Sequence, residues 1–163
     1  MPRSTSATPA RGPGLGATVR ERWDILLVIA AGGALGSLAR WALAEAIPHA
    51  RGGIPIATWT ANLTGAFILG ALLVLVTEVW PPHRHLRPFL AVGVLGGFTT
   101  FSTYMLDAHT LLGAGAPGRL TAYVLGTLVT GLIACWGGIV LTRGIVSARR
   151  NRLRRSHIPP EES

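Results

Sequence analysis

The residues with the clearest chemical potential lie in one short stretch, Gly96-Gly97-Phe98-Thr99-Thr100-Phe101-Ser102-Thr103-Tyr104. Two adjacent glycines weaken a helix, and several hydroxyl-bearing side chains follow them. The stretch lies in an apolar segment long enough to cross a bilayer, where each unsatisfied backbone group costs several kcal/mol. A helix break at that depth is tolerated only where the backbone faces protein, ions or a water-filled path. The stretch therefore predicts a transport site in a third helix that is broken near its middle.

Polar side chains recur at four-residue spacing in the neighbouring apolar segments, and this spacing places them on one helix face. Thr58 and Asn62 share one such face, and Tyr123 and Thr127 share another, which continues to Gly131. The Asn62 amide offers two N–H donors to a ligand, although intramembrane asparagines also commonly join helices. The hydroxyls of the second face can equally bond back to their own helix. Spacing alone leaves both alternatives open.

The candidate groups are neutral hydrogen-bond donors, and the chain has no lysine. Glu45, Glu78 and Asp107 fall towards helix ends. A path lined by neutral donors suits a small anion that forms strong hydrogen bonds, whereas a small four-helix drug or cation exporter needs a carboxylate in mid-membrane. The donors are Thr58, Asn62, Ser102, Thr103, Tyr123 and Thr127.

Two further features have more than one interpretation. Phe101 and Tyr104 lie three residues apart on one helix face, where phenylalanine most often serves packing. Gly32, Gly36 and Arg40 follow four-residue spacing in the first apolar segment, so the glycines allow close helix approach. Arg40 is placed to extend its charge to the membrane interface or to neutralise an anion.

The elements that must position these groups are four apolar stretches, at residues 25–46, 56–80, 89–112 and 120–141. Each is near the roughly 20 residues that a membrane-spanning helix needs. Only 13% of the chain is charged, whereas soluble domains carry about 25%. We therefore predict an all-α membrane protein with one channel-forming domain at 23–143, a disordered basic tail at 1–22 and a basic tail at 144–163. No nucleophile elbow, phosphate loop or zinc-protease pattern indicates an enzyme.

The net charge of +8 has an uneven distribution. Twelve arginines lie before the first stretch, between the second and third, or after the fourth, against Arg40, Arg51 and Arg119 elsewhere. With four spans these three regions share one side, and the positive-inside rule places both termini in the cytoplasm of a cell-membrane protein. The arginines are thus topology signals rather than a nucleic-acid interface. The long leading tail favours retention of the first stretch over cleavage after Ala42-Leu43-Ala44 as a signal peptide.

Three blocks of this chain resemble the CrcB/Fluc family of fluoride channels. They are residues 32–41 (GGALGSLARW), 58–65 (TWTANLTG) and 96–104 (GGFTTFSTY), in order along the first three stretches, and the resemblance covers roughly 25–143. It implies a passive channel that lets fluoride leave the cytoplasm, built from four-helix subunits in an antiparallel dimer with two narrow pores.

The resemblance also implies roles for matching residues. Asn62 would donate to fluoride, and the ring edges of Phe101 and Tyr104 would face it, although the family usually has phenylalanine at the second position. The backbone carbonyls of Gly96 and Thr99 would hold a structural sodium ion at the dimer interface. The remaining residues of the pore, its polar track and its entry are Ser102, Thr103, Tyr123, Thr127, Thr58 and Arg40.

The arginine distribution bears on which partner completes a dimer. A subunit that inserts in both orientations needs nearly balanced positive flanks, and this chain lacks that balance. We therefore expect one fixed orientation, so that an antiparallel dimer would be a heterodimer with an oppositely oriented homologue. A homodimer stays open, as does a non-conducting partner subunit in which Tyr104 disables the pore.

Overall fold

The computed structural model describes residues 22–50, 52–81 and 83–155, and the regular structure in these residues is helical. Four helical segments in the described residues are long and apolar enough to cross a membrane, as predicted. They are Trp23–Ala46, Ile56–Val79, Pro88–Gly113 and Pro117–Leu153. The chain is therefore an all-α, multi-pass membrane protein. The N-terminal tail expected at 1–22 lies outside the described residues except for Arg22.

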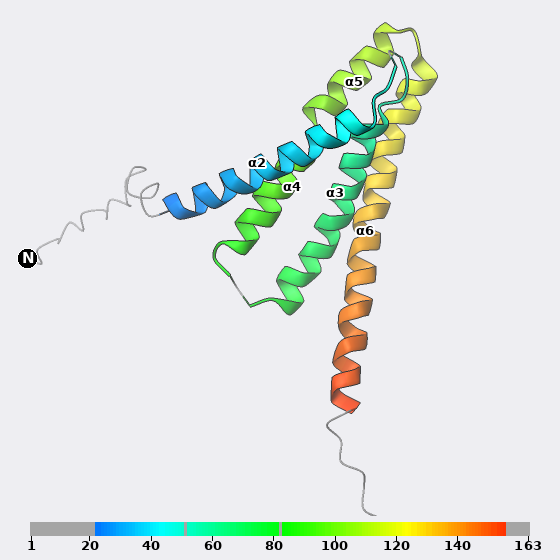
Figure 1. The fold of residues 1–163 in the computed structure, drawn as a ribbon. Coiled ribbons are helices and arrows are strands. Elements are labelled where there is room, and N and C mark those ends of the chain that lie inside the picture. Colours follow the sequence, from blue (N-terminus) through cyan, green and yellow to red (C-terminus); the bar gives the residue numbers. More distant parts are fainter. Residues whose placement is uncertain (1–21, 51, 82, 156–163) are drawn as a thin grey trace, which may run out of the picture.

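The first two spans are α2 (Trp23–Ala46) and α3 (Ile56–Val74), and α3 continues as the π-helical turn η1 (Leu75–Val79). The third consists of η2 (Pro88–Val94), α4 (Leu95–Phe98) and α5 (Ser102–Gly113). The fourth lies in α6 (Pro117–Arg155). Figure 1 shows α3 and α6 side by side, with α2 crossing them obliquely and α5 beside the first turns of α6.

Close backbone contacts explain why glycines recur in these helices. A Cβ atom on Gly32 would lie 2.5 Å from the carbonyl oxygen of Phe89, and one on Gly36 would overlap the carbonyl oxygen of Val94. Helices in a membrane associate through such close packing and through hydrogen bonds, because lipid supplies no hydrophobic drive between them. The expected role of these two glycines is confirmed: they let α2 contact η2 and α4.

Ion pairs join three chain regions at one end of the molecule. Arg84 and His85, in the loop before η2, contact Asp24 in the first turn of α2 at 3.1 and 2.6 Å. Arg143 of α6 donates from Nε and Nη2 to Oε1 of Glu78 in η1, at 2.9 and 2.7 Å. The described parts of the regions that the arginine distribution assigned to one side therefore lie at one end of the molecule.

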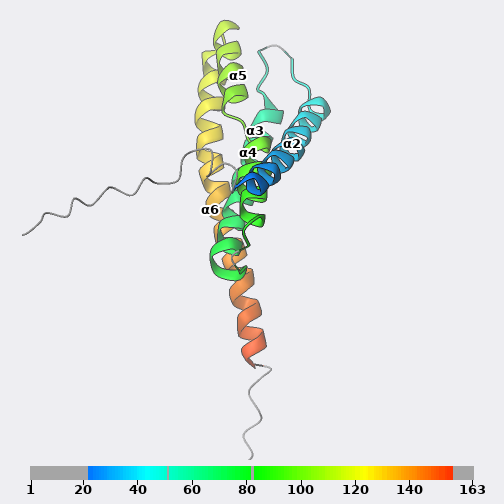
Figure 2. The ribbon, with the colours of Figure 1, turned by 90° about the vertical axis from the view of Figure 1, so that its left-hand side faces the viewer.

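The last helix continues beyond residue 143, where we expected the membrane domain to end. Residues 144–155, the greater part of the expected C-terminal tail, are helical and continuous with the last span. A view rotated by 90° shows the same feature, with the last turns of α6 extending past the other helices (Figure 2).

Candidate functional site

A groove of about 560 Å³ runs along one side of the contact between α3 and α6, and the segment from α4 to α5 forms its third wall. Its lining includes much of the predicted site and no charged side chain among the described residues. The predicted site residues that line it are Asn62, Gly96, Thr99, Phe101, Tyr104 and Thr127. Arg40, Thr58, Ser102, Thr103 and Tyr123 do not line it. Tertiary packing therefore divides the predicted set into two groups.

Asn62 holds the short non-helical segment between α4 and α5. Its Oδ1 accepts the backbone N–H of Thr100 at 2.8 Å, and its Nδ2 donates to the carbonyl of the same residue at 3.0 Å. The amide thus joins helices, which was one of its two alternatives. Within the described residues the second N–H of Nδ2 forms no hydrogen bond, so it remains available to a ligand in the groove.

The same non-helical segment leaves two backbone carbonyls without their helical N–H donors. In a continuous helix the amides of Thr100 and Thr103 would donate to the carbonyls of Gly96 and Thr99. Instead the Thr100 amide donates to Asn62, and the Thr103 amide donates to Oγ1 of Thr100 at 3.1 Å. Thr99 itself is extended, with ψ of 155°. The carbonyls of Gly96 and Thr99 therefore lose the donors that a regular helix would supply.

Arg40 and the hydroxyls after the break stabilise this segment. The Nε of Arg40 donates to the carbonyl of Gly97 at 3.1 Å, which satisfies a carbonyl at the end of α4. Oγ1 of Thr100 also lies 3.1 Å from Oγ1 of Thr103 and 3.3 Å from Oγ of Ser102. Thr100 therefore acts as a cap for α5, a role that we did not predict.

Thr127 lines the groove, and its buried hydroxyl has no hydrogen-bond partner among the described residues. The residue is only 9% exposed, and its Oγ1 has no hydrogen bond among the described residues. Buried polar groups are almost always paired, so an unpaired hydroxyl in a groove lining indicates a ligand position. The four-residue spacing predicted a polar face here, but not that this hydroxyl would be unpaired.

Thr58 and Tyr123 both bond to a carboxylate outside the groove. The Thr58 hydroxyl donates to Oδ2 of Asp107 at 2.7 Å, and the Tyr123 hydroxyl donates to the same oxygen at 3.2 Å. We assigned no role to Asp107 from the sequence, although its place three residues after Tyr104 on α5 was a usable signal. Its contacts join α5 to both α3 and α6.

The rings of Phe101, Tyr104 and Tyr123 form a row that leads from the groove to the hydrogen bonds around Asp107. Ring centroids are 6.0 Å apart for Phe101 and Tyr104, and 5.2 Å apart for Tyr104 and Tyr123. The Tyr104 hydroxyl donates to the carbonyl of Val124 in α6 at 2.9 Å. Phe101 remains 74% exposed at the edge of the groove. The ring of Tyr104 thus lines the groove, while its hydroxyl is engaged elsewhere.

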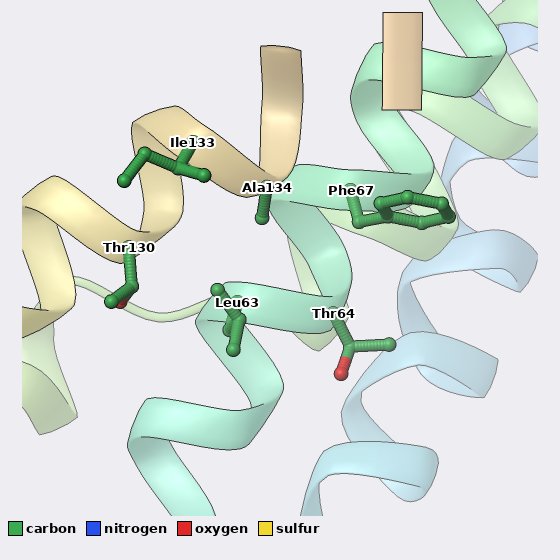
Figure 3. Close-up of a pocket in the computed structure, with 6 residues that line it drawn as sticks. All are labelled: Leu63, Thr64, Phe67, Thr130, Ile133 and Ala134. Atoms are coloured by element: carbon green, nitrogen blue, oxygen red, sulfur yellow. The ribbon is translucent and has the colours of Figure 1, made fainter. Parts of the chain in front are cut away.

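A second groove, of about 460 Å³, lies on another part of the contact between α3 and α6 (Figure 3). Its lining is largely apolar: Leu63, Thr64, Phe67, Thr130, Ile133 and Ala134. The Thr130 hydroxyl there accepts the indole N–H of Trp59 at 2.9 Å and donates to the carbonyl of Gly126 at 2.6 Å. Because that hydroxyl is already paired, the first groove is the better candidate for a polar ligand.

Comparisons with known proteins identify related sequences. The family described as CrcB-like protein, Camphor Resistance (CrcB), matches residues 27–139. A protein of Streptomyces avermitilis named fluoride-specific ion channel FluC 3 is 47% identical over 138 residues, 85% of this chain and 67% of that protein. FluC 2 of Nocardia farcinica is 46% identical over 85% of this chain and 91% of its own length. FluC of Rhodospirillum centenum is 43% identical over 76% of this chain and 98% of its own.

Proposed function

The chain belongs to the CrcB family, and on that premise we propose that it is a subunit of a fluoride-selective ion channel. The channel would let fluoride leave the cytoplasm passively and so lower its concentration in the cell. The unpaired Thr127 hydroxyl in the groove is the observation in this chain that carries the proposal, because it supplies a buried donor that needs an acceptor.

The groove has the chemistry that fluoride requires. A small, strongly hydrated anion enters a narrow path only if several donors replace its water. Asn62 offers an amide N–H and Thr127 a hydroxyl, while the electropositive ring edges of Phe101 and Tyr104 can face an anion. No full positive charge lines the groove in the described residues, so nothing there would trap the ion.

In this proposal the remaining predicted residues do not contact the ion. They position the helices that form the groove, through hydrogen bonds to the interrupted segment or to Asp107. Arg40, Ser102 and Thr103 hold the segment that interrupts the third span. Thr58 and Tyr123 bind the carboxylate of Asp107 and so fix the position of α5. We propose that this interruption is the functional break that the glycine and hydroxyl pattern predicts.

Liposomes loaded with fluoride and chloride test the proposed function. Vesicles that contain the purified chain should release fluoride, as recorded by a fluoride-selective electrode, and retain chloride. A drug or cation exporter would release neither ion and would instead couple transport to a proton gradient. Release of both anions at similar rates would contradict fluoride selectivity.

We also propose a structural sodium ion at the carbonyls of Gly96 and Thr99. Hard oxygen ligands suit a small cation, and unwound backbone in membrane helices supplies such ligands. The two carbonyls fit this role because neither receives its helical amide, and both residues line the groove. When bound, sodium would supply the charge that holds carbonyl dipoles from two subunits together.

A single subunit leaves the groove open along one side, which supports a dimer. Phe101, Leu128 and Leu132 are 74%, 58% and 65% exposed around it. We propose an antiparallel dimer in which a second subunit closes the path. The partner is either a second copy of this chain or an oppositely oriented homologue, and the arginine distribution favours the homologue.

Two measurements separate these alternatives. Tags at both termini, probed in intact cells, should be protected if the termini are cytoplasmic; equal populations facing both ways would contradict a fixed orientation. Cross-linking of the purified single chain should yield no antiparallel dimer if a homologue is required. A conducting antiparallel dimer of the single chain would contradict the heterodimer.

A further inference from the structure

The last helix is much longer than a membrane requires. α6 has 39 residues, which corresponds to about 58 Å at 1.5 Å per residue. A hydrocarbon core about 30 Å thick takes about 20 residues. The final turns of α6 extend past the ends of the other helices in both views (Figures 1 and 2). We call residues 144–155, which follow the Arg143–Glu78 ion pair, the α6 extension.

The extension carries positive charge without acidic partners. Arg149, Arg150 and Arg152 are exposed, and none forms an ion pair among the described residues. No acidic residue occurs in the sequence from 144 to 160. Arg143 differs from them because its charge is paired with Glu78. The three exposed arginines thus leave their charge facing solvent.

The α6 extension lacks the apolar face that a helix lying on a membrane surface needs. Successive residues differ by about 100° around a helix, so Arg150 and Arg152 point about 160° apart, with Arg149 between them. Ser147 and Asn151 occupy much of the remaining circumference. A helix that lies on a membrane needs one apolar face, and this segment lacks a continuous one. Its positive charge covers about half of the helix circumference.

The extension lies beyond one end of the groove along α6. α6 contributes Thr127, Leu132 and Cys135 to the groove, and the extension follows on the same helix. The same end of the molecule also carries Arg84, which is paired with Asp24, and Arg87 at the start of η2. A permeating anion that approaches from this end therefore meets a positive potential before it reaches the groove.

We propose that the α6 extension is an electrostatic collector that concentrates the permeant anion at this end of the groove. The proposal rests on the proposed function, since the anion it collects is fluoride. Charged surfaces raise the local concentration of an oppositely charged substrate and speed its capture, in a manner that depends on ionic strength. The extension would act on capture of fluoride and not on its passage through the groove.

The size of the effect follows from the helix geometry. Arg149, Arg150 and Arg152 lie about 21 to 26 Å along the helix axis beyond Cys135, the last residue of α6 that lines the groove. Three unit charges at about 23 Å in water, with a Debye length of about 30 Å at 0.01 M salt, raise the fluoride concentration at that end of the groove about 1.5-fold. At 0.15 M, where the Debye length is about 8 Å, the enrichment falls to about 1.05-fold.

The test compares the full chain with a variant that carries Arg149→Gln, Arg150→Gln and Arg152→Gln. Both are reconstituted in neutral phosphatidylcholine vesicles, and initial fluoride flux is measured at limiting and saturating fluoride. Impermeant salt sets the ionic strength at about 0.01 or about 0.15 M. We expect the parent flux at limiting fluoride to exceed that of the variant about 1.5-fold at low salt and by only about 5% at high salt, with equal flux at saturation.

A second variant with lysine at the three positions is the matched control, because it keeps the charge and removes the guanidinium groups. It should behave as the parent. Equal fluoride and salt dependence of the glutamine variant and the parent would overturn the collector. So would a difference that appears only in anionic lipid, which would identify lipid binding, or a failure of lysine to restore flux. If neither chain carries fluoride at saturation, the proposed function itself fails.

Discussion

Replacement of Thr127 by valine should have opposite effects on stability and on conduction. Valine has nearly the same shape as threonine, so the change removes the hydroxyl and leaves the packing of α6 intact. Thr127 is 9% exposed, and its buried hydroxyl has no hydrogen-bond partner in the described part of the chain. Burial of an unpaired hydroxyl costs about 1–3 kcal/mol in proteins. The variant should therefore be more stable than the parent by about that amount.

Fluoride flux should fall in the same variant. Hydrogen bonds to charged groups contribute about 1.5–3 kcal/mol, and each 1.4 kcal/mol corresponds to a factor of ten. If Thr127 donates to fluoride in the groove, its loss should lower flux by about 10- to 100-fold. Liposome efflux measures flux, and thermal unfolding of the detergent-solubilised protein measures stability.

Thr121→Val is the matched control on the same helix. Its hydroxyl is exposed and donates to the carbonyl of Pro117 at 3.0 Å, so its removal should change stability by less than about 0.5 kcal/mol and leave flux unchanged. Parental flux in Thr127→Val would refute the inference that this hydroxyl binds the ion. A variant less stable than the parent would show that the hydroxyl has a partner within the protein.

Three other outcomes are expected. Asn62→Asp places a negative charge on the anion path, where the repulsion between two charges 4 Å apart is about 4 kcal/mol at an effective dielectric constant of 20. Fluoride flux should therefore fall by about three orders of magnitude in a protein that still inserts into the membrane. Near-normal flux would show that Asn62 is not part of the pore. Tyr104→Phe loses the hydrogen bond to Val124 but keeps the ring, so fluoride selectivity should persist while the free energy of unfolding falls by about 0.6–2 kcal/mol. A loss of selectivity would mean that the hydroxyl itself contacts the ion. Replacement of sodium by a large organic cation should weaken the dimer, measured by cross-linking, or reduce flux; no change in either would argue against an ion held by the carbonyls of Gly96 and Thr99.

Local features of the sequence were enough to predict the four spans, the close contacts of Gly32 and Gly36, and which regions share one end. Each depends on a property that a short segment carries by itself. Apolar length decides whether a helix can cross hydrocarbon, a missing side chain permits close approach, and four spans return the chain to the same side. None of these features requires knowledge of which helices are neighbours.

Only the tertiary structure decided how the polar groups pair. Asn62 forms a hydrogen bond with Thr100, 38 positions away in the sequence, and Thr58 forms one with Asp107, 49 positions away. The Tyr104 hydroxyl donates to the carbonyl of Val124, while the hydroxyl of Thr127, four residues after Tyr123 on the same helix face, has no partner within the ranges that the structure describes. A donor pairs with whichever acceptor the helix packing brings within about 3 Å, and small changes in helix rotation exchange one acceptor for another. Spacing along the chain therefore predicted which side chains share a face, but the packing of four helices determined which of them pair with one another in the described residues.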